Sequence, residues 1–273
     1  MPMDFDQVAA AWGRWASTFE RGAHAVSEQL VAAAHVRPGC SVLDLGTGPG
    51  EPAFTAAKVV GPSGNVVGID ISPAMIALAR KRAEREGVGN VEFAAADAGA
   101  YNGGRTFDAI VSRFGLQFLP DLDAALLHYR ASLRDGGRFA AATWGAPPDV
   151  PMISLPVALG AQQFGLTPPP IEGGPFALHD AAGLRQRFIA AGYRDVDVQE
   201  MVVPFPFVSA SEYVTYMADV APPFRMLLEQ LAPAQGAALR ADVEEAATAR
   251  FSSSDGALRI PNRVIVISAS SSA

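Results

Sequence analysis

A short apolar strand that runs directly into a glycine-rich turn constrains the fold of this chain more than any other feature. Residues 40–45 (CSVLDL) have the composition of a buried strand, and the turn GTGPG follows at residues 46–50. Residues 51–60 are then expected to form a helix. A strand, a glycine-rich turn and a helix in succession form a cradle for a nucleotide-like ligand, because the helix N-terminus presents free backbone N–H groups.

The same alternation of strand and helix continues through the first half of the chain. Further strands are expected at residues 65–69, 91–95, 107–112 and 138–143. Helices are expected between them at residues 72–86, with Ser72 as N-cap, and at residues 121–134. Alternating strands and helices predict a parallel sheet with helices on both faces. The fold class is therefore α/β, with a doubly wound sheet.

The regular alternation ends at Gly145, where a proline-rich stretch begins. Beyond it we expect a helix at residues 180–191, a strand at 193–203, helical structure at 209–250 and a last strand at 257–268. We divide the chain into an N-terminal helical lid (1–35), a ligand-binding core (36–145), a partly helical, proline-rich cap insertion (146–178), a core helix and strand (179–208), a helical cap (209–256), and a final core strand with a tail (257–273).

Composition excludes several classes of function. The chain has 21 Lys and Arg against 28 Asp and Glu, a net charge of −7, which disfavours nucleic acid as the main ligand. Its single cysteine excludes a disulfide framework. The uncharged stretch from Val150 to Ile171 contains five prolines, so we expect a loop and short helix over an apolar pocket and no membrane insertion. Because the first residues lack a signal-peptide pattern, we expect a cytoplasmic protein.

Two classes of ligand compete for the glycine-rich turn. A dinucleotide-binding loop needs a third glycine where this chain has Glu51, whose carboxylate would repel a pyrophosphate. S-adenosylmethionine carries a carboxylate for the loop N–H groups, and an ammonium and a sulfonium that favour an acid such as Asp44. Asp70, at the end of the second strand, is placed to accept from the ribose hydroxyls. Asp97, just beyond the third strand, is placed to accept from the adenine amine.

Five segments together resemble the class I S-adenosylmethionine-dependent methyltransferase superfamily over residues 36–145: VLDLGTGPG, VVGIDISPAMIALARKRA, VEFAAADA, FDAIVSRFGLQFL and LRDGGRF. The runs FGLQFLPD and LHYRASLRDGGRF are similar to the ubiquinone/menaquinone C-methyltransferases and related small-molecule methyltransferases. Those quinone enzymes typically have an Arg-Asn pair where this chain has Gln117-Phe118. The resemblance implies a seven-stranded Rossmann-like sheet, S-adenosylmethionine as cofactor, and an N-terminal helix that closes over it.

The strand-end pattern and the resemblance together define a set of candidate cofactor contacts. We assign this role to Asp44, Gly46, Thr47, Gly48, Gly50, Asp70, Ile71, Met75, Asp97, Ala98, Arg113 and Trp15. For Ile71 and Met75 the alternatives are packing on the adenine or plain core. For Arg113 they are the ligand crevice or the surface.

Residues 4–34 are predicted to be helical, with a break at Gly22. Trp12, Trp15 and Phe19 repeat at helical spacing, so they belong either to the core or to a lid over the cofactor. We expect residues 1–25 to be mobile without ligand and ordered with it.

His24 and His179 are the candidates for a general base. No metal site is expected, because the fourth strand ends in Ser112-Arg113, where catechol-type methyltransferases place an Asp. The predicted function is transfer of a methyl group from S-adenosylmethionine to an O, C or N atom of a small, largely apolar acceptor, such as a secondary metabolite or a quinone-like compound. A non-catalytic S-adenosylmethionine-binding scaffold and a nicotinamide-dependent oxidoreductase remain as alternatives, and the oligomeric state is open.

Overall fold

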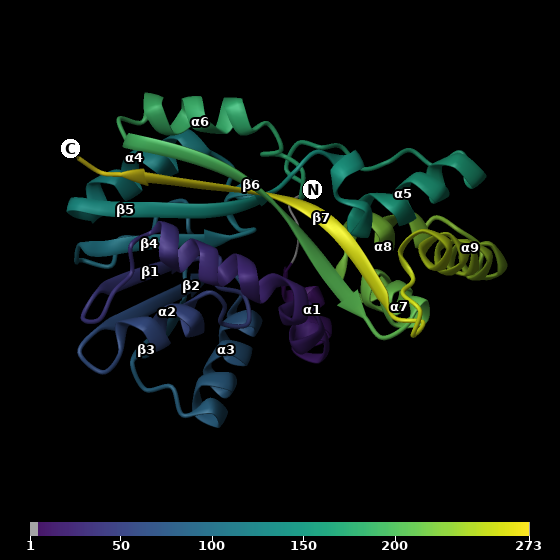
Figure 1. Ribbon diagram of the computed structural model, residues 1–273, viewed down its shortest axis with the longest axis horizontal. Helices are drawn as coiled ribbons and strands as arrows, with labels where there is room; N and C mark the ends of the chain where they lie inside the picture. The colour runs from purple at the N-terminus through teal and green to yellow at the C-terminus, as the bar shows by residue number, and fades with distance from the viewer. Residues whose placement is uncertain (1–4, 273) are drawn as a thin grey trace.

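The computed structural model describes residues 5–272 and has a seven-stranded sheet at its centre (Figure 1). The strands lie in the order β3-β2-β1-β4-β5-β7-β6. Their bounds are β1 Ser41–Leu45, β2 Asn65–Asp70, β3 Val91–Ala95, β4 Phe107–Arg113, β5 Leu133–Trp144, β6 Arg194–Phe207 and β7 Leu258–Ser270. The first residues of the expected lid, 1–4, and the last residue of the expected tail, 273, lie outside the described residues.

The first five strands are parallel, as the alternation of strands and helices predicts. Leu43 of β1 lies opposite Val67 of β2 and Ile110 of β4, and all three side chains are buried. The expectation of a parallel sheet fails only at β7, which pairs antiparallel with both β5 and β6. A parallel strand needs a long crossover connection, whereas β7 follows the cap helices and enters the sheet from the opposite end.

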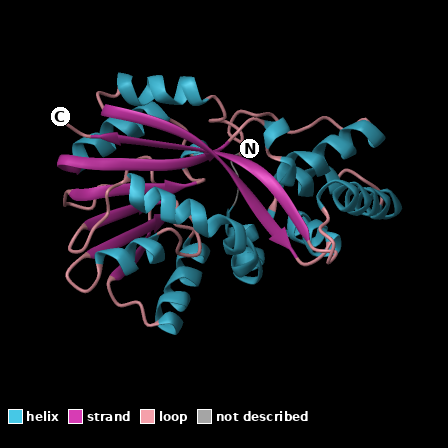
Figure 2. Cartoon of the chain, in the orientation of Figure 1, coloured by secondary structure: helices cyan, strands magenta, loops and turns pink. Residues whose placement is uncertain are grey.

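Helices cover both faces of the sheet (Figure 2). One hydrophobic cluster joins the sheet to α1, α2 and α3, and a second, on the other face, joins it to α4 and α6. The helix bounds are α1 Phe5–Ala33, α2 Ala53–Val60, α3 Pro73–Glu86, α4 Leu122–Ser132, α5 Pro151–Phe164, α6 Ala181–Ala190, α7 Ala210–Val220, α8 Pro222–Leu228 and α9 Pro233–Phe251, with short 3₁₀ turns η1 Leu116–Phe118 and η2 Pro147–Asp149.

The start of α3 forms as its sequence predicts. Ser72 is the N-cap, and its hydroxyl accepts a hydrogen bond from the Met75 N–H at 3.1 Å. Pro73 occupies the first helical turn, and Gly87 ends the helix in the left-handed conformation. These caps fix the helix directly after Asp70, so they also fix the end of β2.

The predicted break at Gly22 is wrong, because α1 runs unbroken from Phe5 to Ala33. A Cβ atom on Gly22 would lie 2.7 Å from the ring of Phe205, which belongs to β6. Gly22 therefore marks a close approach of α1 to the sheet, where a side chain would prevent packing. The cost of glycine inside a helix is offset here by that contact.

The C-terminal end of β6 and the N-terminal end of β7 extend beyond the sheet as a two-stranded ribbon toward α5, α7, α8 and α9 (Figure 1). The sequence predicts an end of the sixth strand at Val203, but β6 continues to Phe207. We call this ribbon end and the four helices the cap. The uncharged stretch from Val150 to Ile171 contains α5, which is longer than the short helix expected. Within residues 5–272, no helix has both the length and the apolar character needed to span a bilayer.

Candidate active site

The glycine-rich turn lies at the carboxyl end of β1, in the middle of the sheet. Gly46, Gly48 and Gly50 all have positive φ, a conformation that side chains disfavour. The N–H groups of Gly46 and Thr47 both donate to the carbonyl of Ile69 at 2.9 Å, which holds the turn against the end of β2. Because β1 and β4 are adjacent, this turn also borders the segment after β4.

Asp70 at the end of β2 holds the turn from the other side. Its Oδ2 accepts from the Gly48 N–H and its Oδ1 from the Ser72 N–H, both at 2.9 Å. Burial raises the pKa of Asp70 above its ordinary value, against the lowering effect of these two hydrogen bonds. Each carboxylate oxygen keeps a further lone pair, so the group can still accept from a ribose diol.

Asp44 is fully buried in β1 and is only half satisfied. Its Oδ2 accepts from the Ala53 N–H at 3.0 Å at the start of α2. Among the described residues, its Oδ1 has no hydrogen-bond partner, and neither has the Thr47 hydroxyl. Burial raises the pKa of Asp44 to about 7, while the Thr47 hydroxyl, which lies near the carboxylate without a hydrogen bond of ordinary geometry, and Arg113 act to lower it. A buried carboxylate oxygen without a partner is a ready site for a ligand cation.

Two of the residues expected to hold the adenine, Ile71 and Asp97, are accessible. Asp97 is exposed, and its Oδ1 accepts from the Gly99 N–H at 2.7 Å, which closes the turn after β3. The carbonyl of Ala98 in that turn accepts from the Tyr129 hydroxyl at 2.6 Å. Ile71, directly after Asp70, is 63% exposed, although it is a large apolar side chain. Ile71 and Asp97 thus leave an apolar surface and an acceptor at neighbouring strand ends.

The first turns of α1 lie over this carboxyl edge of the sheet. Asp6 accepts hydrogen bonds from the Ser72 hydroxyl and, at 3.3 Å, from the Ala74 N–H at the start of α3. Phe5 packs edge-on against Phe118 with ring centroids 5.3 Å apart. Met75 is buried against Val8 and Ala9 of α1, which favours its alternative as a core residue.

Arg113 at the end of β4 does not point to a cofactor either. Its guanidinium is buried and paired with the Glu20 carboxylate, and it also donates to the Ser27 hydroxyl at 2.8 Å and to the carbonyl of Ala23. Burial acts to lower its pKa, but the charge and hydrogen bonds of Glu20, together with the charges of Glu51 and Asp44, raise it overall. We therefore correct its assignment from a cofactor contact to an anchor that binds α1 to the core.

The aromatic residues of α1 divide between the core and the cap. Trp15 donates from Nε1 to Asp219 of α7 at 2.8 Å, so it contacts the cap and not the glycine-rich turn. Phe19 packs edge-on against Trp12 and Phe114, with ring centroids 5.2 and 6.1 Å apart. Phe114 follows β4 and stacks on Trp144, at the end of β5, with centroids 3.9 Å apart. An aromatic cluster thus lies at the carboxyl ends of β4 and β5.

The two candidate bases lie in different surroundings. The side chain of His24 is 51% exposed on α1 and lies 3.6 Å from Glu28, so the structure does not bring it to the carboxyl edge. His179 follows Leu178, whose carbonyl accepts from the Thr143 hydroxyl near the end of β5. The Nδ1 atom of His179 lies 2.8 Å from the Phe176 carbonyl, an interaction that leaves Nε2 as the proton acceptor. In the described part of the chain, no three His, Cys, Asp or Glu side chains group as metal ligands.

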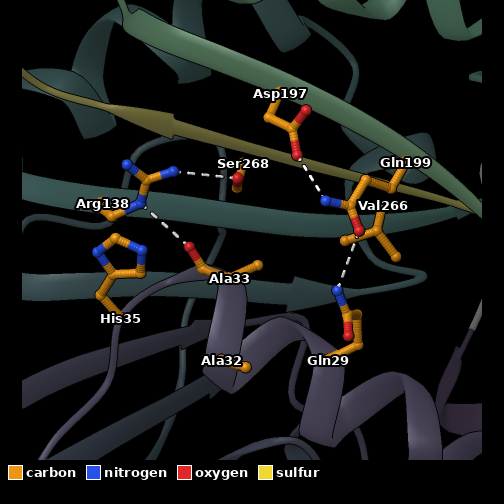
Figure 3. Close-up of a pocket in the computed structure, with 9 residues that line it drawn as sticks. All are labelled: Gln29, Ala32, Ala33, His35, Arg138, Asp197, Gln199, Val266 and Ser268. Atoms are coloured by element: carbon orange, nitrogen blue, oxygen red, sulfur yellow. Dashed lines mark hydrogen bonds between the residues drawn. The ribbon is translucent and has the colours of Figure 1, made fainter.

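A polar cavity of about 290 Å³ lies elsewhere, beneath the C-terminal end of α1 (Figure 3). There Arg138 donates to the carbonyl of Ala33 and to the Ser268 hydroxyl, each at 3.1 Å. Arg138 pairs with Ala109 near the start of β4, far along the strands from the glycine-rich turn. Because its groups are bonded to each other and not to the carboxyl edge, we do not place the active site in this cavity.

The sequence does not predict two residues that the structure places at the carboxyl edge of the sheet. Asp6 holds α1 over the start of α3, and nothing in its local sequence marks that role. Gln117 lies in η1 and is buried, and within residues 5–272 its amide has no hydrogen-bond partner. The sequence shows it only as a departure from the Arg-Asn pair of related enzymes.

Comparison with known proteins agrees with this geometry. Residues 37–155 match the family model described as a methyltransferase domain. Aklanonic acid methyltransferase DauC of Streptomyces sp. (strain C5) is 38% identical over 139 residues, 49% of this chain and 63% of that protein. The ubiquinone/menaquinone biosynthesis C-methyltransferase UbiE of Hahella chejuensis is 34% identical over 153 residues, 55% of this chain and 61% of that protein. The matches thus span somewhat less than two thirds of these relatives.

Among solved structures, the YcgJ protein from Bacillus subtilis superposes with a TM-score of 0.58 at 18% identity, over 92% of this chain and 99% of that one. A similarity of this kind concerns the fold. Residues 37–155 are thus similar to a methyltransferase domain, and the chain shares the fold of that solved structure.

Proposed function

We propose that this protein transfers a methyl group from S-adenosylmethionine to a small, largely apolar acceptor. The observation that carries the proposal is the fully buried Asp44, whose Oδ1 has no partner among the described residues beside the glycine-rich turn. A phosphate-bearing ligand would meet that carboxylate and the buried Glu51, and both would repel it. A ligand with an ammonium and a sulfonium satisfies Asp44.

Along the carboxyl edge, the strand order β3, β2, β1 matches the order of the adenine, the ribose and the methionine end of this cofactor. Asp97 and Ile71 would hold the adenine beside β3 and β2, and Asp70 would accept from the ribose hydroxyls. The glycine-rich turn and Asp44 would then hold the methionine end beside β1. Because β4 and β5 come next in the sheet, the acceptor belongs on their side of the cofactor.

The bound cofactor supplies an already activated methyl group, so this chain has to align two molecules and exclude water. The first turns of α1 cover the edge, and Asp6 fixes them to α3. Phe114, which is half-buried and stacks on the buried Trp144, gives the acceptor side an apolar, aromatic character. Aromatic faces also attract a sulfonium, by roughly 0.5–2 kcal/mol.

For an acceptor whose proton must leave, His179 is the candidate base. The Phe176 carbonyl accepts from its Nδ1–H in the tautomer that leaves Nε2 free to take a proton. We retain His179 in this role and withdraw His24, which lies on the exposed side of α1.

The acceptor class rests on the aromatic cluster of Phe114 and Trp144 and on the relatives. The name of one relative refers to aklanonic acid and that of the other to ubiquinone/menaquinone biosynthesis, so both names point to small molecules. The net charge of −7 argues against a nucleic acid as acceptor. We further place the protein in the cytoplasm, where its one cysteine, Cys40, stays a free, buried thiol.

A two-part experiment separates the proposal from its rivals. Calorimetric titration of the protein with S-adenosylmethionine and with NADH should show binding of S-adenosylmethionine only. Incubation with S-adenosylmethionine and a panel of phenols and quinones should then yield S-adenosylhomocysteine and a product 14 mass units heavier. Binding of NADH alone would favour an oxidoreductase, and binding without turnover on any acceptor would favour a scaffold.

A further inference from the structure

Gln117 has a buried amide that the fold leaves without partners. The residue is 3% exposed, and in the part of the chain that the structure describes neither Nε2 nor Oε1 has a hydrogen-bond partner. Buried amides are bonded in most proteins, because removing one from water without compensation is unfavourable. Folding of the chain alone does not explain this unpaired amide, and binding of a ligand is the simplest explanation.

The position of Gln117 places it beside the methyl-transfer site. It belongs to η1, which begins directly after Gly115. A Cβ atom on Gly115 would lie 2.8 Å from the carbonyl oxygen of Leu45, so this segment touches the start of the glycine-rich turn. Phe118, the next residue, packs under Phe5 at the start of α1. Gln117 thus lies between the turn and the covering helix.

The order of the strands separates Gln117 from the cofactor residues. Asp97, Asp70 and Asp44 belong to β3, β2 and β1 or directly follow them, whereas Gln117 follows β4. It therefore lies beyond the methionine end of the cofactor, on the side of the Phe114 and Trp144 stack. An apolar acceptor bound there would meet the amide of Gln117, a polar group that no other described residue satisfies.

We infer that Gln117 is a specificity-determining residue that binds a hydrogen-bond donor and acceptor held side by side on a flat acceptor molecule. The Gln117 Nε2–H donates to a carbonyl of that molecule, and Oε1 accepts from its neighbouring N–H or O–H. Lactams, carboxamides and hydroxy-ketones carry such a pair, whereas a simple phenol or an ether does not. The inference rests on the proposed function, because it assumes that the acceptor lies on this side of the cofactor.

Two matched probes test the pairing. The flat compound 2-quinolone has a lactam N–H beside its carbonyl, and N-methyl-2-quinolone lacks the donor. Their affinities are measured for the wild-type protein saturated with S-adenosylhomocysteine. We expect about tenfold tighter binding of 2-quinolone than of its N-methyl derivative, in line with the value of paired neutral hydrogen bonds. In Gln117→Met, which keeps the size but not the polar atoms, the two affinities should be equal.

The outcomes separate the inference from the proposed function. Gln117→Met should fold and bind S-adenosylhomocysteine as the wild type does, because the amide forms no hydrogen bond within the described chain and none to the cofactor is proposed. Gln117→Leu serves as a second apolar variant if Met disturbs the packing. Absence of 2-quinolone binding, an equal affinity for both probes in the wild type, or a preference that persists in the variants overturns the inference. Loss of S-adenosylhomocysteine binding in both variants also overturns it. Failure of the wild type to bind S-adenosylhomocysteine would instead overturn the proposed function.

Discussion

The cofactor edge and the cap are built in different ways. At the cofactor edge, short loops are held by carboxylates that accept from nearby backbone N–H groups, as Asp70 does from Gly48 and Ser72. The cap is held by side chains from segments far apart in the chain, such as the Tyr213 hydroxyl that donates to the Met152 carbonyl at 2.9 Å. The first kind of structure leaves a compact motif in the sequence, and the second does not.

Within the part of the chain that the structure describes, helix α1 connects the two regions through three ion pairs of unequal burial. Arg113 and Glu20 join α1 to the core, and their side chains are 5% and 18% exposed. Arg21 pairs with Glu212 of the cap, and the more exposed Arg14 pairs with Asp219. If the account is right, breaking the contact to the core should harm folding, whereas breaking the contacts to the cap should chiefly affect the acceptor.

The largest effect is expected for Glu20→Ala. The substitution leaves the Arg113 guanidinium buried without its carboxylate, which typically costs about 3–5 kcal/mol of stability. Urea unfolding measures this cost. Arg14→Ala is the matched control, because its side chain is 61% exposed and such pairs contribute about 0–1 kcal/mol. Equal losses in the two variants would contradict the assignment of Arg113 as an anchor.

The next effect concerns the cofactor edge itself. Asp70→Ala removes the acceptor for the ribose hydroxyls and the brace of the Gly48 N–H, and hydrogen bonds to a charged group contribute roughly 1.5–3 kcal/mol. The affinity for S-adenosylmethionine should therefore fall at least about tenfold by calorimetry. Asp195→Ala, at the far edge strand β6, is the control and should bind normally. Unchanged affinity in a folded Asp70→Ala protein would rule out the ribose site.

A pH effect of similar or smaller size is expected from Asp44. Its pKa is raised by burial to about 7, so the folded protein binds a proton that the unfolded chain, with a pKa near 3.8, releases. Stability due to this group is therefore present at low pH and is lost as the pH rises from about 4 to 7. Cofactor affinity should change in the opposite direction, because the ionised carboxylate attracts the cationic ligand.

Calorimetry at several pH values checks the sign of this effect. Wild-type affinity for S-adenosylmethionine should rise between pH 6 and pH 8, by less than about tenfold per unit. Asp44→Asn keeps the shape and should lose most of this rise. A variant that retains the full pH dependence would show that another group is responsible.

The smallest effect is expected from the contact between α1 and the cap. Trp15→Phe keeps the aromatic packing on Tyr216 but removes the hydrogen bond to the Asp219 carboxylate. This bond is worth less than the roughly 1.5–3 kcal/mol of a bond to a buried charged group, because the Asp219 side chain is 33% exposed. We expect a slight loss of stability, unchanged cofactor affinity and a higher KM for the acceptor. A large fall in cofactor affinity would restore Trp15 to the cofactor site.

The sequence predicts the cofactor edge well, because each of its parts is local. The residue types of Gly46, Gly48 and Ser72 predict their roles in the turn and the helix cap. The position of Asp70 is predicted because it ends a strand. The surroundings of Arg113 and Met75 could not be predicted, since their partners on α1 lie about 70 to 90 residues away in the chain. No local pattern reveals such a pairing, and the partners decide whether a side chain faces a ligand or the core.

The cap illustrates the same limit. Its helices are visible in the sequence, but the packing of Gly22 on Phe205 and the extension of β6 to Phe207 depend on contacts between distant segments. Gln117 is the opposite case. Its residue type and position are local, but its missing partners can be recognised only in the folded structure.

Hydrogen exchange with and without S-adenosylhomocysteine tests the central claim most directly, because it shows where the ligand lies and what covers it. We predict added protection at residues 44–50, 70–75 and 97–100 and in the first turns of α1, with no change in α9. This also tests the expected ordering of residues 1–25, although Glu20 and Gly22 in that range already pack on the core. Protection gained only in the cap or around the Arg138 cavity, or none in α1, would contradict a cofactor site under that helix.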